Sequence, residues 1–379
     1  MSVHGKVAVV TGAGTGLGRQ YAIALAAKGA KVLVNDYGGT LEGQAGSVSR
    51  AQSVVDEIKA AGGTAIAHGG DVSKDGKAII QAAVEAFGTV HILINNAGIS
   101  GKPSSHDDVD GPAFMRVLEI GVLGTTMVTS AAYPIMARQK YGRIVNVSSN
   151  AIYGFGAGGD CAYGASKGAI FAITRELGRW SSQDGIKINC IMPSAASRMG
   201  DLSEGTKTVT RTYFPPEGVV PFALALCSEE CPTSGEVFSA SADRAARETL
   251  ATFPGLKSES TEGFLQDWDT VMGTNDSPFL AESTLDHVNQ RLCAERYAKD
   301  LIAFINGAEP WPANGNDKLP GAMIYDAPIE GGRDESVFVP KRTPETTART
   351  NFLVDLVGED SLDKLLQANQ MFLVSALQK

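Results

Sequence analysis

The feature that most constrains this chain is a cluster of glycines between an apolar strand pattern and a helical pattern. Residues 7–10 are β-branched or small and apolar, and they lead directly into Thr11-Gly12-Ala13-Gly14-Thr15-Gly16-Leu17-Gly18. From residue 18 to 28, apolar residues recur at the three-and-four spacing of a helix. Glycine permits positive φ and close approach of the backbone, and a helix N-terminus offers unpaired N–H groups to an anion. The loop therefore predicts a dinucleotide phosphate site, with Gly12, Thr15, Gly16, Leu17 and Gly18 as its candidate residues.

Short apolar runs alternate with longer helical patterns over the first two thirds of the chain. The expected strands are residues 7–10, 31–35, 65–67, 90–94, 143–147, 187–191 and 236–239. Alternation of this kind is typical of βαβ units and a parallel sheet. We therefore predict an α/β fold, a doubly wound Rossmann-type sheet of about seven parallel strands flanked by helices.

The rest of the chain has a different pattern. Residues 253–273 and 282–306 look helical, residues 307–346 are rich in Pro, Gly and charge, and a final amphipathic helix is expected from about 352 to 377. The expected domains are 1–250 for the dinucleotide-binding fold, 251–306 for helices packed on it, and 307–379 for an extended arm and terminal helix.

Charge and composition restrict the class of partner. The formal net charge is −9 and no run of Lys or Arg occurs, which argues against nucleic acid and acidic membranes and favours a small-molecule substrate. No stretch of 18 uninterrupted apolar residues is present, and the first residues lead straight into a strand pattern with no signal-peptide layout. The five Cys have no metal-ligand spacing. We expect a cytoplasmic protein without a metal.

Two acidic residues follow strands at positions suited to an adenosine. Asp36 ends the second expected strand, about twenty residues past the glycine loop, where a carboxylate accepts bonds from ribose hydroxyls and repels a 2′-phosphate. This favours NAD over NADP, although Asp36 could instead cap the turn that begins at Gly38. Asp71 and Val72 follow the third strand, where the carboxylate could lie near the adenine amino group or merely cap a helix.

A hydroxyl, a phenol and an amine follow the fifth expected strand. Ser148 and Ser149 end that strand, while Tyr163 and Lys167 lie four residues apart on one face of the next helix. A phenol is a poor base at neutral pH, but an adjacent ammonium group and a positive nicotinamide ring would make it more acidic. Ser149 would then bond the substrate oxygen, with Ser148 as a minor alternative.

The order of these motifs resembles the short-chain dehydrogenase/reductase family. The glycine loop, Asn95-Asn96-Ala97-Gly98, Ser149, Tyr163 and Lys167 occur in the family order over at least residues 5–250. The segments 34–39, 141–144, 152–154 and 193–199 are similar to the (3R)-hydroxyacyl-CoA dehydrogenase unit of peroxisomal multifunctional enzyme type 2, and this similarity weakens toward residue 306. The resemblance includes no counterpart for the segment after residue 306.

The resemblance implies catalysis by Ser149, Tyr163 and Lys167. It also implies cofactor contacts by Asn95, Ala97, Gly98 and Ser197, with Tyr163 and Lys167 at the nicotinamide ribose, and assembly into a homodimer or homotetramer. One departure is Gly121, where the family usually has an Asn that holds a relay water.

The expected function is NAD-dependent hydride transfer between the nicotinamide and a secondary alcohol or ketone of a bulky substrate, for which a 3-hydroxyacyl-CoA is the first candidate. A steroid or terpenoid alcohol is the alternative substrate. A catalytically idle dinucleotide-binding sensor or assembly protein is the alternative of another class, against which the intact Ser149, Tyr163 and Lys167 weigh.

Overall fold

The chain divides into two compact units, Met1–Glu248 and Thr249–Lys379. The computed structural model describes residues 3–40, 46–101, 107–154, 161–196, 211, 214–253, 255–273 and 278. Ser197, the expected boundary at 306, the arm and the terminal helix lie outside these residues, so those predictions stay predictions.

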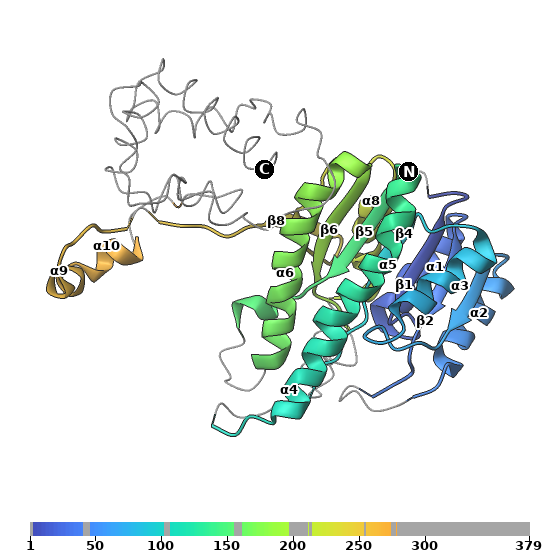
Figure 1. Ribbon diagram of the computed structural model, residues 1–379, viewed down its shortest axis with the longest axis horizontal. Coiled ribbons are helices and arrows are strands. Elements are labelled where there is room, and N and C mark those ends of the chain that lie inside the picture. Colours follow the sequence, from blue (N-terminus) through green and yellow to red (C-terminus); the bar gives the residue numbers. More distant parts are fainter. Residues whose placement is uncertain are drawn as a thin grey trace, which may run out of the picture. The chain divides into compact units, whose positions relative to one another are not determined.

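The first unit contains an eight-stranded sheet in the order β3-β2-β1-β4-β5-β6-β7-β8 (Figure 1). Its strands are β1 (Val7–Thr11), β2 (Lys31–Asn35), β3 (Thr64–His68), β4 (Ile92–Asn95), β5 (Gly142–Val147), β6 (Ile186–Pro193), β7 (Val237–Ser241) and β8 (Arg244–Glu248). The first seven pair in parallel and β8 pairs antiparallel to β7. The predicted doubly wound α/β fold is confirmed.

The eighth strand is the one that the sequence pattern missed. Its five residues are two Arg, two Ala and one Glu and are mostly exposed, so they show no alternation of buried and exposed positions. A tight turn at Ala242 and Asp243, both with positive φ, brings β8 back along β7. The strand exists because the chain reverses there, a feature that hydrophobic periodicity does not report.

Helices cover both faces of the sheet (Figure 1). They are α1 (Gly16–Ala27), α2 (Ser49–Ala60), α3 (Gly76–Phe87), α4 (Gly111–Leu118), the π-helical turn η1 (Glu119–Gly124), α5 (Thr125–Arg138), α6 (Cys161–Ser181) and α8 (Val220–Cys227). Alternate side chains of β1 point to opposite faces. Ala8 and Val10 pack in the core cluster that includes residues of α1, α2 and α8, whereas Val9 packs with residues of α3 and α5.

Within the part of the chain that the structure describes, one helix is long and apolar enough to cross a membrane by length and composition: the continuous segment Gly111–Arg138. Of its most apolar window, 44% is buried inside the protein, and its parts contact α3, α6 and β4. A core helix of an α/β unit passes the same test, and these contacts favour that explanation.

The described part of the second unit has less helix than predicted. Residues 253–273 contain two short helices, α9 (Thr261–Gln266) and α10 (Trp268–Met272), instead of one. Ser260 caps α9 by accepting a hydrogen bond from the Gly263 N–H. Asp267 separates the two helices with φ −127° and ψ 50°, outside the helical region.

Candidate active site

The strand order reverses between β1 and β4, and the predicted site residues follow strands on both sides of that reversal. In an open parallel sheet the crevice beyond the carboxyl ends at such a point is the usual ligand position. The glycine loop follows β1, Asp36 follows β2, Asp71 follows β3, and Ser149 follows β5. Topology therefore places all four predicted segments along one edge of the sheet.

The glycine loop has the geometry that an approaching phosphate requires. Gly12 and Gly16 have φ of +60° and +55°, values that favour glycine. A Cβ on Gly12 would lie 2.8 Å from the Ala97 Cα, whereas one on Gly16 would meet no atom of the described chain within 4 Å. Thr15 precedes α1 in extended conformation and makes no side-chain cap. The N-terminus of α1 is thus available to an anion, which fits the pyrophosphate of a dinucleotide.

The loop after β4 is bonded to the glycine loop. The Asn96 side chain donates to the carbonyls of Thr11 and Gly12, each at 3.0 Å, and the Thr11 hydroxyl accepts from the N–H groups of Asn96 and Ala97. The Asn95 side chain instead donates to Thr129 and Asn146 within the fold. Asn96 and Thr11, which the site prediction left out, are therefore the residues that join the two loops.

Asp36 is buried and bonded to the glycine loop. Its Oδ2 accepts from the Gly14 N–H and its Oδ1 from the Gly38 N–H, both at 2.7 Å. The turn-capping role that the sequence allowed is therefore present. A carboxylate has about four lone-pair positions, so these two bonds leave acceptor capacity for ribose hydroxyls.

Asp71 is held by bonds from three directions. Its Oδ2 lies 2.7 Å from Nη2 of Arg116 on α4, and its Oδ1 accepts from the N–H and the hydroxyl of Ser73. Burial alone would raise the pKa of Asp71, but the hydrogen bonds from Arg116 and Ser73 outweigh burial and lower it. The carboxylate therefore stays ionised at neutral pH.

The predicted catalytic residues lie at the carboxyl end of β5. Lys167 is buried, its Nζ donates to the Val147 carbonyl at 2.8 Å, and the same Nζ is 5.5 Å from the centre of the Tyr163 ring. A Cβ on Gly98 would lie 3.4 Å from this Nζ, so the loop after β4 borders the amine. Tyr163 and Lys167 share one face of α6, as the spacing predicted.

The two serines after β5 point in different directions. The Ser148 hydroxyl donates to the Lys167 carbonyl at 2.7 Å and is buried against α6. The Ser149 hydroxyl caps the short helix η2 (Asn150–Tyr153) by accepting from the Ala151 N–H at 3.1 Å. The Ser148 hydroxyl hydrogen is committed to α6 at 2.7 Å, whereas that of Ser149 has only a longer bond, 3.3 Å to the Asn150 Oδ1, so Ser149 is the better candidate for binding a substrate oxygen.

Comparison with known proteins identifies the family. The family model for short chain dehydrogenase matches residues 6–202. The peroxisomal multifunctional enzyme type 2 of Drosophila melanogaster is 40% identical over 378 residues, covering 96% of this chain and 61% of that protein.

This chain belongs to the short-chain dehydrogenase family.

Two solved structures of family members are also similar. A short chain dehydrogenase from Mycobacterium avium has 32% identity and a TM-score of 0.62, over 73% of this chain and 97% of that chain. A 7α-hydroxysteroid dehydrogenase complexed with NADH and 7-oxo glycochenodeoxycholic acid has 28% identity and a TM-score of 0.56, over 63% of this chain and 94% of that chain. Members of the family use NAD or NADP, and this chain is accordingly an oxidoreductase.

The chain spans less than two thirds of some of its larger relatives. It covers 61% of the Drosophila melanogaster enzyme and 31% of the peroxisomal hydratase-dehydrogenase-epimerase of Saccharomyces cerevisiae, to which it is 37% identical. A match over 96% of the chain extends past residue 306, so the C-terminal segment, for which the sequence suggested no counterpart, has one in the Drosophila protein.

Gly121 departs from the usual family pattern and lies opposite the catalytic helix. It is buried in the π-helical turn η1, and its carbonyl accepts from the Thr125 hydroxyl at 2.8 Å. A Cβ at this position would lie 3.3 Å from the Ser166 Cβ on α6. An Asn here would need Ser166 to move, which is a physical reason for glycine.

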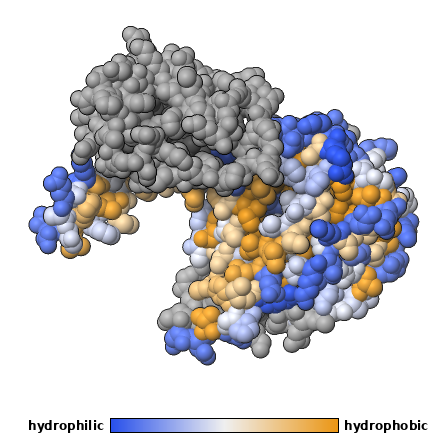
Figure 2. Space-filling model, in the orientation of Figure 1, coloured by the Kyte–Doolittle hydropathy of each residue, from blue (hydrophilic) through white to orange (hydrophobic). Residues whose placement is uncertain are grey.

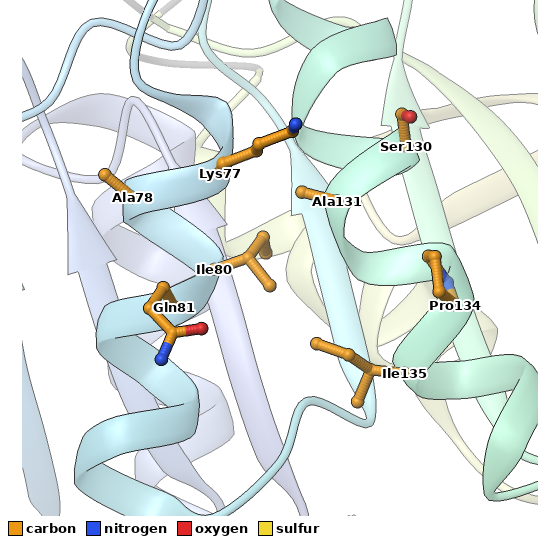
Figure 3. Close-up of a pocket in the computed structure, with 8 residues that line it drawn as sticks. All are labelled: Lys77, Ala78, Ile80, Gln81, Ser130, Ala131, Pro134 and Ile135. Carbon is orange, nitrogen blue, oxygen red and sulfur yellow. The ribbon is translucent and has the colours of Figure 1, made fainter.

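A groove lies between α3 and α5 (Figure 3). The labelled side chains of Lys77, Ile80, Ala131 and Ile135 point into it, and its lining is mostly apolar. Lys77 is its one titratable lining residue, so the groove offers no acid–base pair for catalysis.

Proposed function

We propose that the chain is an NAD-dependent dehydrogenase that interconverts a secondary alcohol and a ketone on a bulky substrate. The observation that carries this proposal is the position of Lys167, whose Nζ is bonded to the end of β5, borders Gly98 and faces the Tyr163 ring. The glycine loop follows β1 and the Lys167 amine lies at the end of β5, on the two sides of the point where the strand order reverses. One dinucleotide bound across that point would reach both.

The proposed chemistry divides among three side chains. When bound, NAD accepts a hydride from the carbinol carbon. The Tyr163 side-chain oxygen acts as the base that accepts the hydroxyl proton, and the Lys167 amine lies beside its ring. Ser149 donates its hydroxyl hydrogen to the substrate oxygen, on which negative charge develops. Lys167 also contacts the nicotinamide ribose in this proposal, so one amine serves both binding and proton transfer.

Asp36 supports NAD over NADP. Its buried carboxylate is fixed by Gly14 and Gly38, so it cannot swing away from a 2′-phosphate without breaking two backbone hydrogen bonds. A like charge held in place repels an anion more than a mobile surface carboxylate does. Asp71 and Val72 would border the adenine, and Gly12 to Gly18 the pyrophosphate.

The substrate is proposed to be a 3-hydroxyacyl-CoA. Support comes from the 40% identity to a peroxisomal multifunctional enzyme type 2 and from the sequence similarity to its dehydrogenase unit. A steroid alcohol is the second candidate, because a structural relative at 28% identity is a 7α-hydroxysteroid dehydrogenase.

One spectroscopic experiment separates these candidates. The purified full chain is mixed with NAD or NADP and with (3R)-3-hydroxyacyl-CoA, its (3S) epimer or a hydroxysteroid, and absorbance at the reduced nicotinamide band is followed. We expect turnover with NAD and the (3R) thioester. Turnover only with the steroid would support the second candidate, and NADH binding without turnover on any alcohol would support the idle sensor.

Assembly and location are proposed separately. The long helix after β4 carries exposed apolar side chains, including Met115 and Leu123, and Figure 2 shows apolar residues gathered over this face. We propose that this face forms a homodimer or homotetramer, which light scattering of the full chain tests. The predicted cytoplasmic location competes with a peroxisomal one, given the names of the relatives, and fractionation of cells that make the protein decides between them.

A further inference from the structure

An ion pair joins the turn after β3 to the long helix on the catalytic side. Arg116 on α4 and Asp71 are 45 residues apart in sequence, yet Nη2 and Oδ2 are 2.7 Å apart and the Asp71 side chain is only 7% exposed. Arg116 is itself fixed by Glu119, 3.2 Å from its Nη1. Asp71 therefore has a partner with little freedom to move.

The bonds to Asp71 leave limited acceptor capacity. Oδ1 accepts two hydrogen bonds from Ser73, which occupy both of its lone-pair positions. Oδ2 accepts one bond from Arg116, so one position remains on that oxygen. A carboxylate arranged in this way can accept one more donor from a fixed direction.

The helix that carries Arg116 is also fixed against this turn. A Cβ on Gly124 would lie 2.5 Å from the Val72 Cγ2, which shows how closely the helix approaches. The same continuous helix includes Gly121, opposite Ser166 on the catalytic helix. One rigid element thus contacts both the Asp71 turn and α6.

We infer that Arg116 is a positioning residue for adenine recognition: it orients the Asp71 carboxylate so that the remaining lone pair of Oδ2 accepts a hydrogen bond from the adenine 6-amino group. This inference rests on the proposed dinucleotide-dependent function. Arg116 acts through Asp71 and does not touch the cofactor.

The test compares two reduced dinucleotides that differ in one group. Reduced nicotinamide hypoxanthine dinucleotide has a 6-oxo group, an acceptor, where NADH has the 6-amino donor. Affinities of the full chain for both are measured by fluorescence titration. We expect the wild type to favour NADH by about tenfold, because an acceptor facing a fixed carboxylate is repelled.

Three variants locate the effect. Arg116→Met should bring the ratio of the two affinities close to one, because Asp71 loses its fixed orientation. Arg116→Lys should give a ratio between that of Arg116→Met and that of the wild type. Asp71→Asn should narrow or reverse it, because an amide can donate to the 6-oxo group. Arg175→Met is the matched control: it breaks an ion pair with Glu236 that does not involve Asp71, and it should keep the wild-type ratio.

Each failure has a distinct meaning. If Arg116→Met weakens both dinucleotides by the same factor, Arg116 supports the fold only and the inference is overturned. If Arg116→Met does not fold, a wild-type ratio in Asp71→Asn overturns it instead. Equal wild-type affinity for both dinucleotides also overturns it while leaving the proposed function intact. Failure of the wild type to bind either one removes the proposed function itself.

Discussion

The amino-terminal and carboxyl-terminal edges of the sheet both carry polar side chains, but the cluster around Tyr141 at the amino-terminal edge is bound within the fold, whereas several groups at the carboxyl-terminal edge keep capacity to bind another molecule. At the amino-terminal edge, Lys6 and Arg143 lie over the Tyr141 ring, 4.0 and 4.5 Å from its centre. Arg143 also donates to the main-chain carbonyls of Ser228, Glu229 and Gly142. Most of the Arg143 donors are therefore used within the fold.

At the carboxyl-terminal edge, bonds within the fold fix each group without exhausting it. Asp36 and Asp71 retain lone pairs, the first helical turn of α1 has no side-chain cap, and Tyr163 is only half-buried. This difference indicates that a binding edge is marked by polar groups that the fold holds in one orientation and that keep unused hydrogen-bonding capacity. The following predictions test that distinction, from the largest expected effect to the smallest.

Removing the proposed proton-transfer group should give the largest change. Tyr163→Phe should lower kcat by about 10²–10⁴-fold while NADH affinity stays near that of the wild type, since general acid–base catalysis contributes a factor of this size. Stopped-flow turnover and fluorescence titration measure the two quantities. Tyr133→Phe is the matched control, because its hydroxyl donates to Asp184, which precedes β6 at the opposite edge. Equal turnover of Tyr163→Phe and the control would refute the assignment.

Removing the Arg143 guanidinium from the amino-terminal edge should lower stability and leave cofactor binding unchanged. Arg143→Met leaves the carbonyls of Ser228 and Glu229 without their buried donor, so the free energy of unfolding should fall by about 2–4 kcal/mol. Urea denaturation gives that value, and the dissociation constant for NADH should change less than about twofold. A loss of cofactor affinity at unchanged stability would contradict the comparison.

Variants of Asp36 test how a charge at the carboxyl-terminal edge selects between NAD and NADP. We expect the wild type to prefer NAD over NADP by at least about tenfold, equivalent to about 1.4 kcal/mol. Asp36→Asn should narrow this preference and keep part of the turn, because the amide oxygen can still accept from one backbone N–H. Asp36→Ala removes both bonds to Gly14 and Gly38 and should also lower the thermal midpoint. Equal kinetics of the wild type with both cofactors would remove the claim.

The smallest effect concerns acid stability. The pKa of Asp71 is lowered because hydrogen bonds from Arg116 and Ser73 outweigh burial. A lowered pKa stabilises the fold above the ordinary aspartate value of about 3.9, and this stabilisation is lost as the pH falls through the lowered pKa. Arg116→Met should therefore be less stable than the wild type near pH 7, by less than about 1 kcal/mol, with the gap closing in acid. Chemical denaturation at several pH values measures it, and a gap that widens in acid would show that another group is responsible.

Much of the fold could be predicted from the sequence because its signals are local. The glycine loop, the β-branched runs and the helical periodicity each lie within about twenty residues, and together they predict parallel strands joined by helices. Tyr163 and Lys167 share a face because a helix repeats every 3.6 residues. Strand β8 and the break at Asp267 were missed, because backbone geometry and not periodicity produces them.

What the sequence determined by itself is the set of groups at the ends of the strands: the glycines, Asp36, Asp71, Ser149, Tyr163 and Lys167. The tertiary structure decided how these groups are used. It turned the Ser148 hydroxyl toward α6, bonded Asp36 to Gly14, and set Arg116 against Asp71. The physical reason is that hydrogen-bond partners 19 to 45 residues apart are brought together by sheet order and helix packing. No pattern along the chain records which lone pairs remain free once those bonds have formed.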